Sequence, residues 1–310
     1  MQPRPGLDTL TRQGVLLTAQ ALDAGWPMRA LHRALARDGW SRVRAGARVA
    51  PGREIDLRTQ LLVEQLLNPR LVVSHLAAAW LWRIETLGPT PPSPEFTDPT
   101  LRTNNKGGLR RRAHRSRLDP TEVREVRGLR VTSPVRTVTD LLLAGPRDAA
   151  LVAVESAVTR RTVHGVRRAR LTGLTAVADA LNLPHPPRRS QAWLRLADPA
   201  SGSPAETVAR LAMLDAGLRP ESQAELITHE GRQVFVDFLF RAEGLAVEIE
   251  GYAYHGTREH HRRDIDRFNR IQSCPQVRAL LRFTAVDVFR GRSRFSAEVH
   301  RALAALRKHG

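Results

Sequence analysis

The 310-residue chain has one cysteine, Cys274, and only two lysines, Lys106 and Lys308, so almost all of its positive charge is arginine. A single cysteine excludes an internal disulfide framework and a cysteine-rich zinc site. No apolar run is long enough to cross a membrane, and residues 1–6 lack the apolar segment of a signal peptide. These absences predict a cytoplasmic protein with no membrane partner.

The net charge is strongly positive, at +18, which favours a polyanionic partner such as nucleic acid. Residues 201–310 hold 17 basic and 14 acidic side chains, whereas residues 1–200 hold 32 basic and 17 acidic ones. The sequence therefore predicts that the first 200 residues do most of the holding of nucleic acid.

The length of the chain and its proline- and glycine-rich segments predict a multidomain α/β protein. We expect a helix-turn-helix domain over 1–55, an α/β region over 56–182, a proline-rich linker over 183–202, and a second α/β domain with a central mixed sheet over 203–310.

Two neighbouring apolar segments of the last domain contain carboxylates at unusual positions. Residues 234–240 and 245–250 alternate with period two, which predicts two strands joined by a four-residue hairpin loop. A symmetric hairpin pairs Phe240 with Leu245 and therefore places Asp237 opposite Glu248, with Glu250 on the same face. Like charges this close call for a cation, and oxygen ligands suit Mg²⁺ or Mn²⁺.

A simpler interpretation is that one face of these strands meets water. Three acids together, followed by Tyr254-His255 and by Asp264 and Arg267, favour a metal-binding catalytic site instead. The run Ser203–Glu206, then Val236–Phe238, Glu248–Gly251, Tyr254-His255, Asp264-x-x-Arg267 and Leu281–Thr284 resembles the PD-(D/E)XK nuclease superfamily. Within it, the run is most similar to the very-short-patch-repair-like endonucleases, over about residues 201–310.

This resemblance implies a metal-dependent phosphodiester hydrolase with Mg²⁺ or Mn²⁺ as cofactor. It implies Asp237 and Glu248 as metal ligands, Glu206 as an auxiliary acid, and His255 and Asp264 as polar groups that assist at the phosphate. The superfamily lysine is replaced by Glu250, so His255 or Arg267 would supply the proton transfer or the positive charge. The zinc site of the mismatch-repair members is excluded by the lone cysteine.

Residues 7–51 have the pattern of a winged helix-turn-helix. The helix predicted from Met28 onward places Met28, Leu31 and Leu35 on one face, and the glycine-centred alternation over 40–49 predicts a wing. The arginines expected to contact DNA are Arg29, Arg33, Arg37, Arg42, Arg44 and Arg48. A generic helical subdomain with solvated arginines is the alternative.

These residues, with Val72–Ala79 and Val131–Leu141, resemble the AbiEi family of type IV antitoxins over about residues 7–160. The resemblance implies that the winged helix binds operator DNA and represses its operon, and that a nucleotidyltransferase-like toxin is a partner.

Three other polar features occur in the first 200 residues. Ser74 and His75 fit the start of a helix, and no acid near them in sequence completes a catalytic triad. Arg136 and Asp140 are four residues apart and predict an ion pair. The basic stretch over 102–117 suits either phosphate contact or a solvated hairpin.

Three hypotheses follow from the sequence. The first is a nuclease whose front half holds DNA. The second is an antitoxin-like repressor with an inactive nuclease fold. The third is a toxin-neutralising protein that uses the C-terminal domain as a scaffold.

Overall fold

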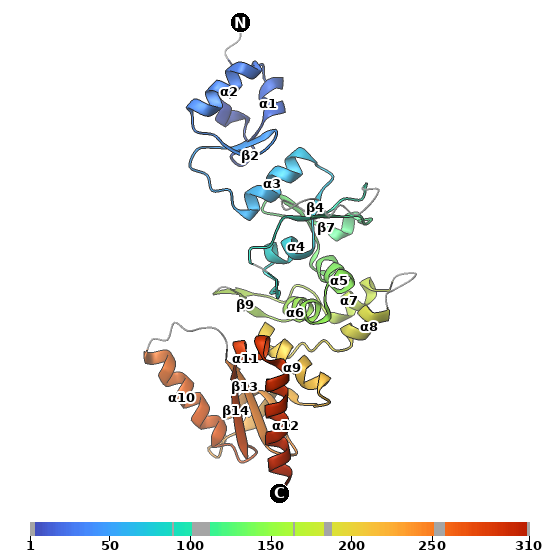
Figure 1. The fold of residues 1–310 in the computed structure, drawn as a ribbon, viewed down its shortest axis with the longest axis vertical. Helices are drawn as coiled ribbons and strands as arrows, with labels where there is room; N and C mark the ends of the chain where they lie inside the picture. Colours follow the sequence, from blue (N-terminus) through green and yellow to red (C-terminus); the bar gives the residue numbers. More distant parts are fainter. Residues whose placement is uncertain are drawn as a thin grey trace. The chain divides into compact units, whose positions relative to one another are not determined.

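The computed structural model describes residues 4–88, 90–100, 112–163, 165–182, 188–250 and 258–308, with side chains omitted for 258–264. The protein is of the mixed α/β class and has several separate sheets (Figure 1). It divides into two compact units, Met1–Trp82 with Gly88–Asp140 (unit 1) and Arg83–Leu87 with Leu141–Gly310 (unit 2). The division falls inside the region predicted over 56–182, and helix α8 (Arg188–Leu194) lies within the range predicted as a linker. In the described part of the chain, no helix has the length and apolar character needed to cross a bilayer.

Unit 1 begins with a small helical module closed by a three-stranded antiparallel sheet, of order β1-β3-β2. Its elements are η1 (Leu7–Leu10), β1 (Val15–Leu17), α1 (Thr18–Asp23), α2 (Met28–Arg37), β2 (Ser41–Arg44) and β3 (Ala47–Val49). Leu31 and Leu35 of α2 are buried against Trp40, as their spacing predicts. Met28, expected on the same face, is 46% exposed. It is the first residue of α2, and helical side chains lean toward the N-terminus, so Met28 projects past the helix end.

The rest of unit 1 is built on a five-stranded mixed sheet of order β6-β5-β4-β8-β7. Its elements are α3 (Leu57–Leu67), β4 (Val72–Val73), α4 (His75–Leu81), β5 (Glu95–Thr97), β6 (Arg112–His114), η2 (Pro120–Glu122), β7 (Val123–Val126) and β8 (Leu129–Thr132). Val73, Phe96 and Val131 form its core with the apolar face of α3. The side chain of Gln65 on α3 accepts from the Arg130 amide and donates to the carbonyls of Leu71 and Arg130, which fixes α3 to the sheet.

Unit 2 opens with helices and a small hairpin. The elements, of which α5 begins in unit 1, are α5 (Pro134–Ala144), α6 (Arg147–Val158), β9 (Arg161–Val163), β10 (Val166–Arg168), α7 (Leu174–Ala180), α8 and α9 (Pro204–Asp215). Helix α6 meets α9 through polar side chains that are almost fully buried. Glu155 has no exposed surface, accepts from Thr207 Oγ1 at 2.6 Å, and forms an ion pair with Arg210.

The C-terminal part of unit 2 is a four-stranded mixed sheet of order β11-β12-β13-β14. Its elements are β11 (Glu221–Ile227), β12 (Gln233–Phe240), β13 (Leu245–Glu250), α10 (Arg258–Gln272), β14 (Ala279–Thr284), α11 (Ala285–Arg290) and α12 (Arg292–Lys308). The first three strands are antiparallel, and β14 runs parallel to β13. Phe240 pairs with Leu245, as the hairpin arithmetic predicts. Gly244 has a φ of +66°, and a Cβ there would lie 2.9 Å from the Gln276 carbonyl, so this turn requires glycine.

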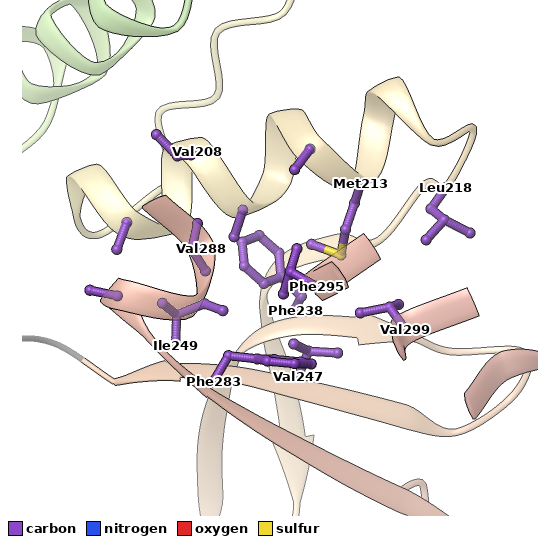
Figure 2. Close-up of a cluster of buried hydrophobic side chains, with 14 of the residues drawn as sticks. Val208, Met213, Leu218, Phe238, Val247, Ile249, Phe283, Val288, Phe295 and Val299 are labelled. Carbon is purple, nitrogen blue, oxygen red and sulfur yellow. The ribbon is translucent and has the colours of Figure 1, made fainter. Parts of the chain in front are cut away.

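Two apolar layers hold this sheet. On one face, Val208 and Met213 of α9 and the side chains of α11 and α12 pack on Phe238 and Val247 (Figure 2). Leu239 and Ala246 alternate with these strand residues and pack with Ile271 of α10. Glu248 alternates with Val247 and so belongs to the face that α10 covers. Asp237 lies between Val236, which packs with Ile271, and Phe238, which packs with α9, so the alternation of β12 is interrupted at Asp237.

Candidate functional site

Asp237 and Glu248 lie where the β12–β13 ladder ends. The last regular pair is Phe238 with Val247, one step before the two acids. The Asp237 amide donates to Glu248 Oε1 at 3.1 Å, and the Ile249 amide donates to Asp237 Oδ2 at 2.8 Å. Each carboxylate therefore accepts a hydrogen bond from a backbone amide of the opposite strand, in the place that a backbone carbonyl takes in a regular ladder. The exchange fixes the two acids as neighbours.

Glu206 reaches the same place from the first turn of α9. That helix begins with Ser203 as N-cap, whose Oγ accepts from the Glu206 amide at 3.2 Å, followed by proline. The Glu206 carboxylate accepts from the Gly202 amide at 2.6 Å and from Gln223 Nε2 at 2.9 Å. It is 8% exposed.

Gln223 of β11 connects two of the acids. Its Nε2 donates to Glu206 Oε2 and, at 3.0 Å, to Asp237 Oδ1. Gln223 has a φ of 47°, although it lies inside a strand, and left-handed non-glycine residues are costly and concentrate at functional sites. Sequence analysis missed this residue, because neither its type nor its place in an alternating strand distinguishes it.

The environment of Asp237 opposes the ionisation of its carboxyl group. Asp237 is 9% exposed. Burial raises its pKa to about 7, and the negative charges of Glu248 and Glu206 act in the same direction. The Ile249 N–H and Arg267 lower it by less. A cation placed among these oxygens would remove the penalty.

Positive charge comes from α10 and β14. Arg267 Nη2 contacts Glu248 Oε2 at 2.9 Å and donates to the Phe235 carbonyl at 3.1 Å, with 45% of its side chain exposed. Glu250, expected to join the other two acids, forms an ion pair with Arg282 instead. The guanidinium of Arg282 lies 4.7 Å from the centre of the Phe268 ring. Glu250 is therefore a carboxylate paired with an arginine.

Two predicted residues cannot be placed. His255 lies outside the described residues, and Asp264 belongs to α10 by its backbone but its side chain is not among those described. The described part of the site thus brings together Glu206, Asp237, Glu248 and Arg267. A metal at Asp237 and Glu248 would have two protein carboxylates, which is within the range usual for Mg²⁺.

The arginines predicted to contact DNA differ in their availability. Arg29, Arg33 and Arg37 on α2 and Arg42 on β2 are exposed. Arg37 also pairs with Asp38 at 2.7 Å. Arg44 is half-buried in an ion pair with Glu64, and Arg48 Nη1 donates to the Trp40 carbonyl at 3.1 Å.

A second polar cluster lies in unit 1, and sequence analysis missed it. His75, at the start of α4, stacks on His114 of β6 with ring centres 3.7 Å apart. His114 Nε2 and Glu95 Oε1 of β5 are 2.8 Å apart and form a hydrogen bond. Burial and the neighbouring His114 lower the pKa of His75 to about 3. No signal in the sequence marked the cluster, because β5 is the short segment Glu95–Thr97 within a proline-rich stretch.

The surroundings of this cluster include the predicted Arg136–Asp140 ion pair, which is confirmed at 2.7 Å. Burial raises the pKa of Asp140 to about 6. Ser74 occupies the N-cap position of α4, but its Oγ contacts His75 Nδ1 at 2.9 Å and does not cap the helix.

Comparison with protein families finds no match, and comparison with curated proteins finds none either. Among solved structures, the chain is similar to the crystal structure of the RV2827C protein from Mycobacterium tuberculosis. The two share 15% sequence identity with a TM-score of 0.41, over 70% of this chain and 84% of that chain. A likeness of this strength supports no inference about function.

Proposed function

We propose that unit 2 carries a divalent-metal-dependent nuclease site and that the winged helix-turn-helix of unit 1 binds DNA. The observation that carries the proposal is the exchange of hydrogen bonds between Asp237 and Glu248. It holds two acids side by side in a buried setting that raises the pKa of Asp237 to about 7. Buried acids with opposed ionisation are typical of metal and catalytic sites.

The surroundings of the two acids support the same function. The sheet is mixed, as the PD-(D/E)XK resemblance implies, and Glu206 lies on the preceding helix as the auxiliary acid would. In such a site, bound Mg²⁺ or Mn²⁺ activates a water and polarises the phosphoryl oxygen. Asp237 and Glu248 would hold the ion, and Gln223 would orient Asp237 through its amide.

Arg267 is suited to a second role. It is half exposed and bound to Glu248, so a metal at Glu248 would free its guanidinium for a phosphate oxygen. His255 is proposed as the proton relay, because histidine titrates near neutral pH.

The charge of the front half supports the DNA-binding part of the proposal. Exposed arginines on one helix and on the adjoining hairpin suit a recognition helix and wing, namely Arg29, Arg33, Arg37 and Arg42. A cytoplasmic enzyme acting on DNA fits these features.

A binding protein without nuclease activity is the second candidate function, and one observation favours it. Arg267 and Arg282 pair with Glu248 and Glu250, so two of the acids are neutralised by the chain's own arginines. An antitoxin-like repressor with an inactive nuclease fold would keep such pairs.

The experiment is a cleavage assay on plasmid DNA, single-stranded DNA and RNA with Mg²⁺ or Mn²⁺. Wild type is compared with Asp237→Ala and Glu248→Gln. The matched control is Glu230→Gln, because the Glu230 side chain is 71% exposed. We expect the first two to lose cleavage while DNA binding persists, and the control to cleave normally. Intact substrates with wild type, together with a gel shift, would favour the repressor. Cleavage surviving Asp237→Ala would exclude this site.

A further inference from the structure

We propose that His75, Glu95 and His114 in unit 1 form a transition-metal site of the kind that binds zinc. Each residue offers one ligand atom, and these atoms all lie within 4.8 Å of one another. Around a tetrahedral zinc ion, with bonds of about 2.0–2.2 Å, ligand atoms lie roughly 3.3 Å apart. The most widely separated ligand atoms must therefore approach by up to about 1.5 Å, and the stacked rings of His75 and His114 must turn so that both face one ion, which side-chain rotation can provide.

The donor set selects the class of metal. Two imidazoles and one carboxylate are a common three-ligand set for zinc with a fourth position open, whereas Mg²⁺ prefers oxygen ligands alone. The site is therefore chemically distinct from the all-carboxylate pair at Asp237 and Glu248.

Three different elements supply these ligands. His75 is the first residue of α4, and its φ of 51° lies in the left-handed region, where non-glycine residues mark ligand and active sites. Glu95 and His114 lie on the adjacent parallel strands β5 and β6. A bound ion would therefore tie β6, at the edge of its sheet, to the centre of unit 1.

Hydrogen-bonding groups next to the cluster orient two of the three ligands, as is usual around protein-bound metals. Ser74 Oγ contacts His75 Nδ1 at 2.9 Å, which leaves Nε2 of that ring as the ligand atom. The Leu76 amide donates to Glu95 Oε2 at 3.1 Å, which directs Oε1 toward His114. A metal would replace the proton now shared between Glu95 Oε1 and His114 Nε2.

A buried polar atom beside the cluster also points to a ligand. Thr97 is opposite His114 in the β5–β6 register and has no exposed surface. Its Oγ1 has no hydrogen-bond partner among the described residues. Buried hydroxyls are nearly always bonded, so this one indicates an additional group, such as a metal-bound water, at the cluster.

The local charge permits a cation. Glu95 is the carboxylate of the set, and the neighbouring Arg112 approaches it only to 3.4 Å, with 62% of its side chain exposed. Arg112 can therefore turn into solvent. Arg136, the next arginine, is already paired with Glu122 and Asp140.

The test uses the full-length chain carrying Asp237→Asn, so that the carboxylate site in unit 2 cannot account for binding. Metal-stripped protein is titrated with Co²⁺, whose visible ligand-field absorption reports nitrogen ligation, and then with competing Zn²⁺. We expect one Co²⁺ per chain, displaced by Zn²⁺. Glu95→Gln, which keeps the size of the side chain, and His114→Ala should abolish the absorption. Ser74→Ala should weaken binding about 10–100-fold.

The control is His32→Ala, which removes an exposed histidine of α2 and should change nothing. Circular dichroism shows whether each variant is folded, and if His114→Ala is not, Glu95→Gln and Ser74→Ala decide the outcome. The proposal is overturned if the parent chain shows no Co²⁺ absorption, or if the absorption survives Glu95→Gln. Neither outcome bears on nuclease activity, which is measured separately.

Discussion

Replacing Asp237 by asparagine should stabilise the metal-free protein at pH 8, although it removes a proposed metal ligand. The pKa of this carboxyl is raised from 3.8 to about 7, and one pKa unit corresponds to about 1.4 kcal/mol. Keeping Asp237 ionised in the folded protein at pH 8 therefore costs on the order of 4 kcal/mol relative to the unfolded chain. Asparagine avoids this cost, but its side-chain nitrogen cannot accept a hydrogen bond, so the bond from either Gln223 or Ile249 is lost at a cost of about 1–3 kcal/mol. A net gain of about 1–3 kcal/mol is expected.

The dependence on pH has a definite sign. Between the unfolded and folded pKa values, the folded protein holds a proton that the unfolded chain has lost, so stability falls as pH rises from about 4 to about 7. Below that window the gain from Asp237→Asn should vanish. Urea unfolding, followed by circular dichroism at several pH values, measures this gain in the free energy of unfolding. Hydrogen exchange in β12 and β13 shows whether the gain belongs to unit 2.

A control substitution should change stability in the opposite direction. Asp215 is paired with Arg147, and that hydrogen bond lowers its pKa, so Asp215→Asn should destabilise the protein at pH 8 and not at low pH. Mn²⁺ bound at Asp237 and Glu248 should offset the first result, because it would stabilise the wild type at this site by about 2.7 kcal/mol at one hundred times the dissociation constant. If Asp237→Asn changed stability equally at pH 4 and pH 8, the reasoning about this buried acid would be refuted.

Three further outcomes are expected. Phe238 is 1% exposed between two packed layers, so Phe238→Ala should cost about 3–5 kcal/mol in urea unfolding, and a loss below about 1 kcal/mol would contradict the packing. Glu155→Gln leaves buried Arg210 with only Asp198, 3.7 Å away, as counter-charge and should cost about 3 kcal/mol by the same measurement, unless Arg210 is also replaced by leucine. Arg29→Ala with Arg33→Ala should reduce the slope of log affinity for DNA against log salt by about 2 in fluorescence anisotropy, and an unchanged slope would remove α2 from the DNA interface.

The features that sequence predicts well here are local. The pairing of Phe240 with Leu245 follows from alternation and loop length, and the Arg136–Asp140 pair follows from helical spacing. The alternation also places Asp237 and Glu248 at adjacent positions. It does not show that the ladder stops there, because that depends on the side chains taking over the backbone bonds.

The features that sequence misses depend on distant contacts. His114 meets Glu95 because β6 pairs with β5 in parallel, and neither short strand is marked by periodicity. Gln223 is defined by its unusual φ and by two acids from other elements. Glu250 was expected on the same face as Asp237 and Glu248, and nothing in the sequence indicated that Arg282 of β14, more than thirty residues later, would pair with it.

The buried pair between Glu155 and Arg210 determines how the protein can be divided for study. A fragment beginning at residue 203 would keep Arg210 and lose Glu155, and it would expose the surface of α9 that α6 covers, including the contact with Val152. Such a fragment should aggregate or unfold even though it contains the whole sheet. A fragment beginning at Leu141 keeps both charges, but it lacks Arg83–Leu87 of unit 2 and so separates buried Arg161 from its ion-pair partner Glu85. Both segments of unit 2 are therefore needed in a piece expected to fold alone.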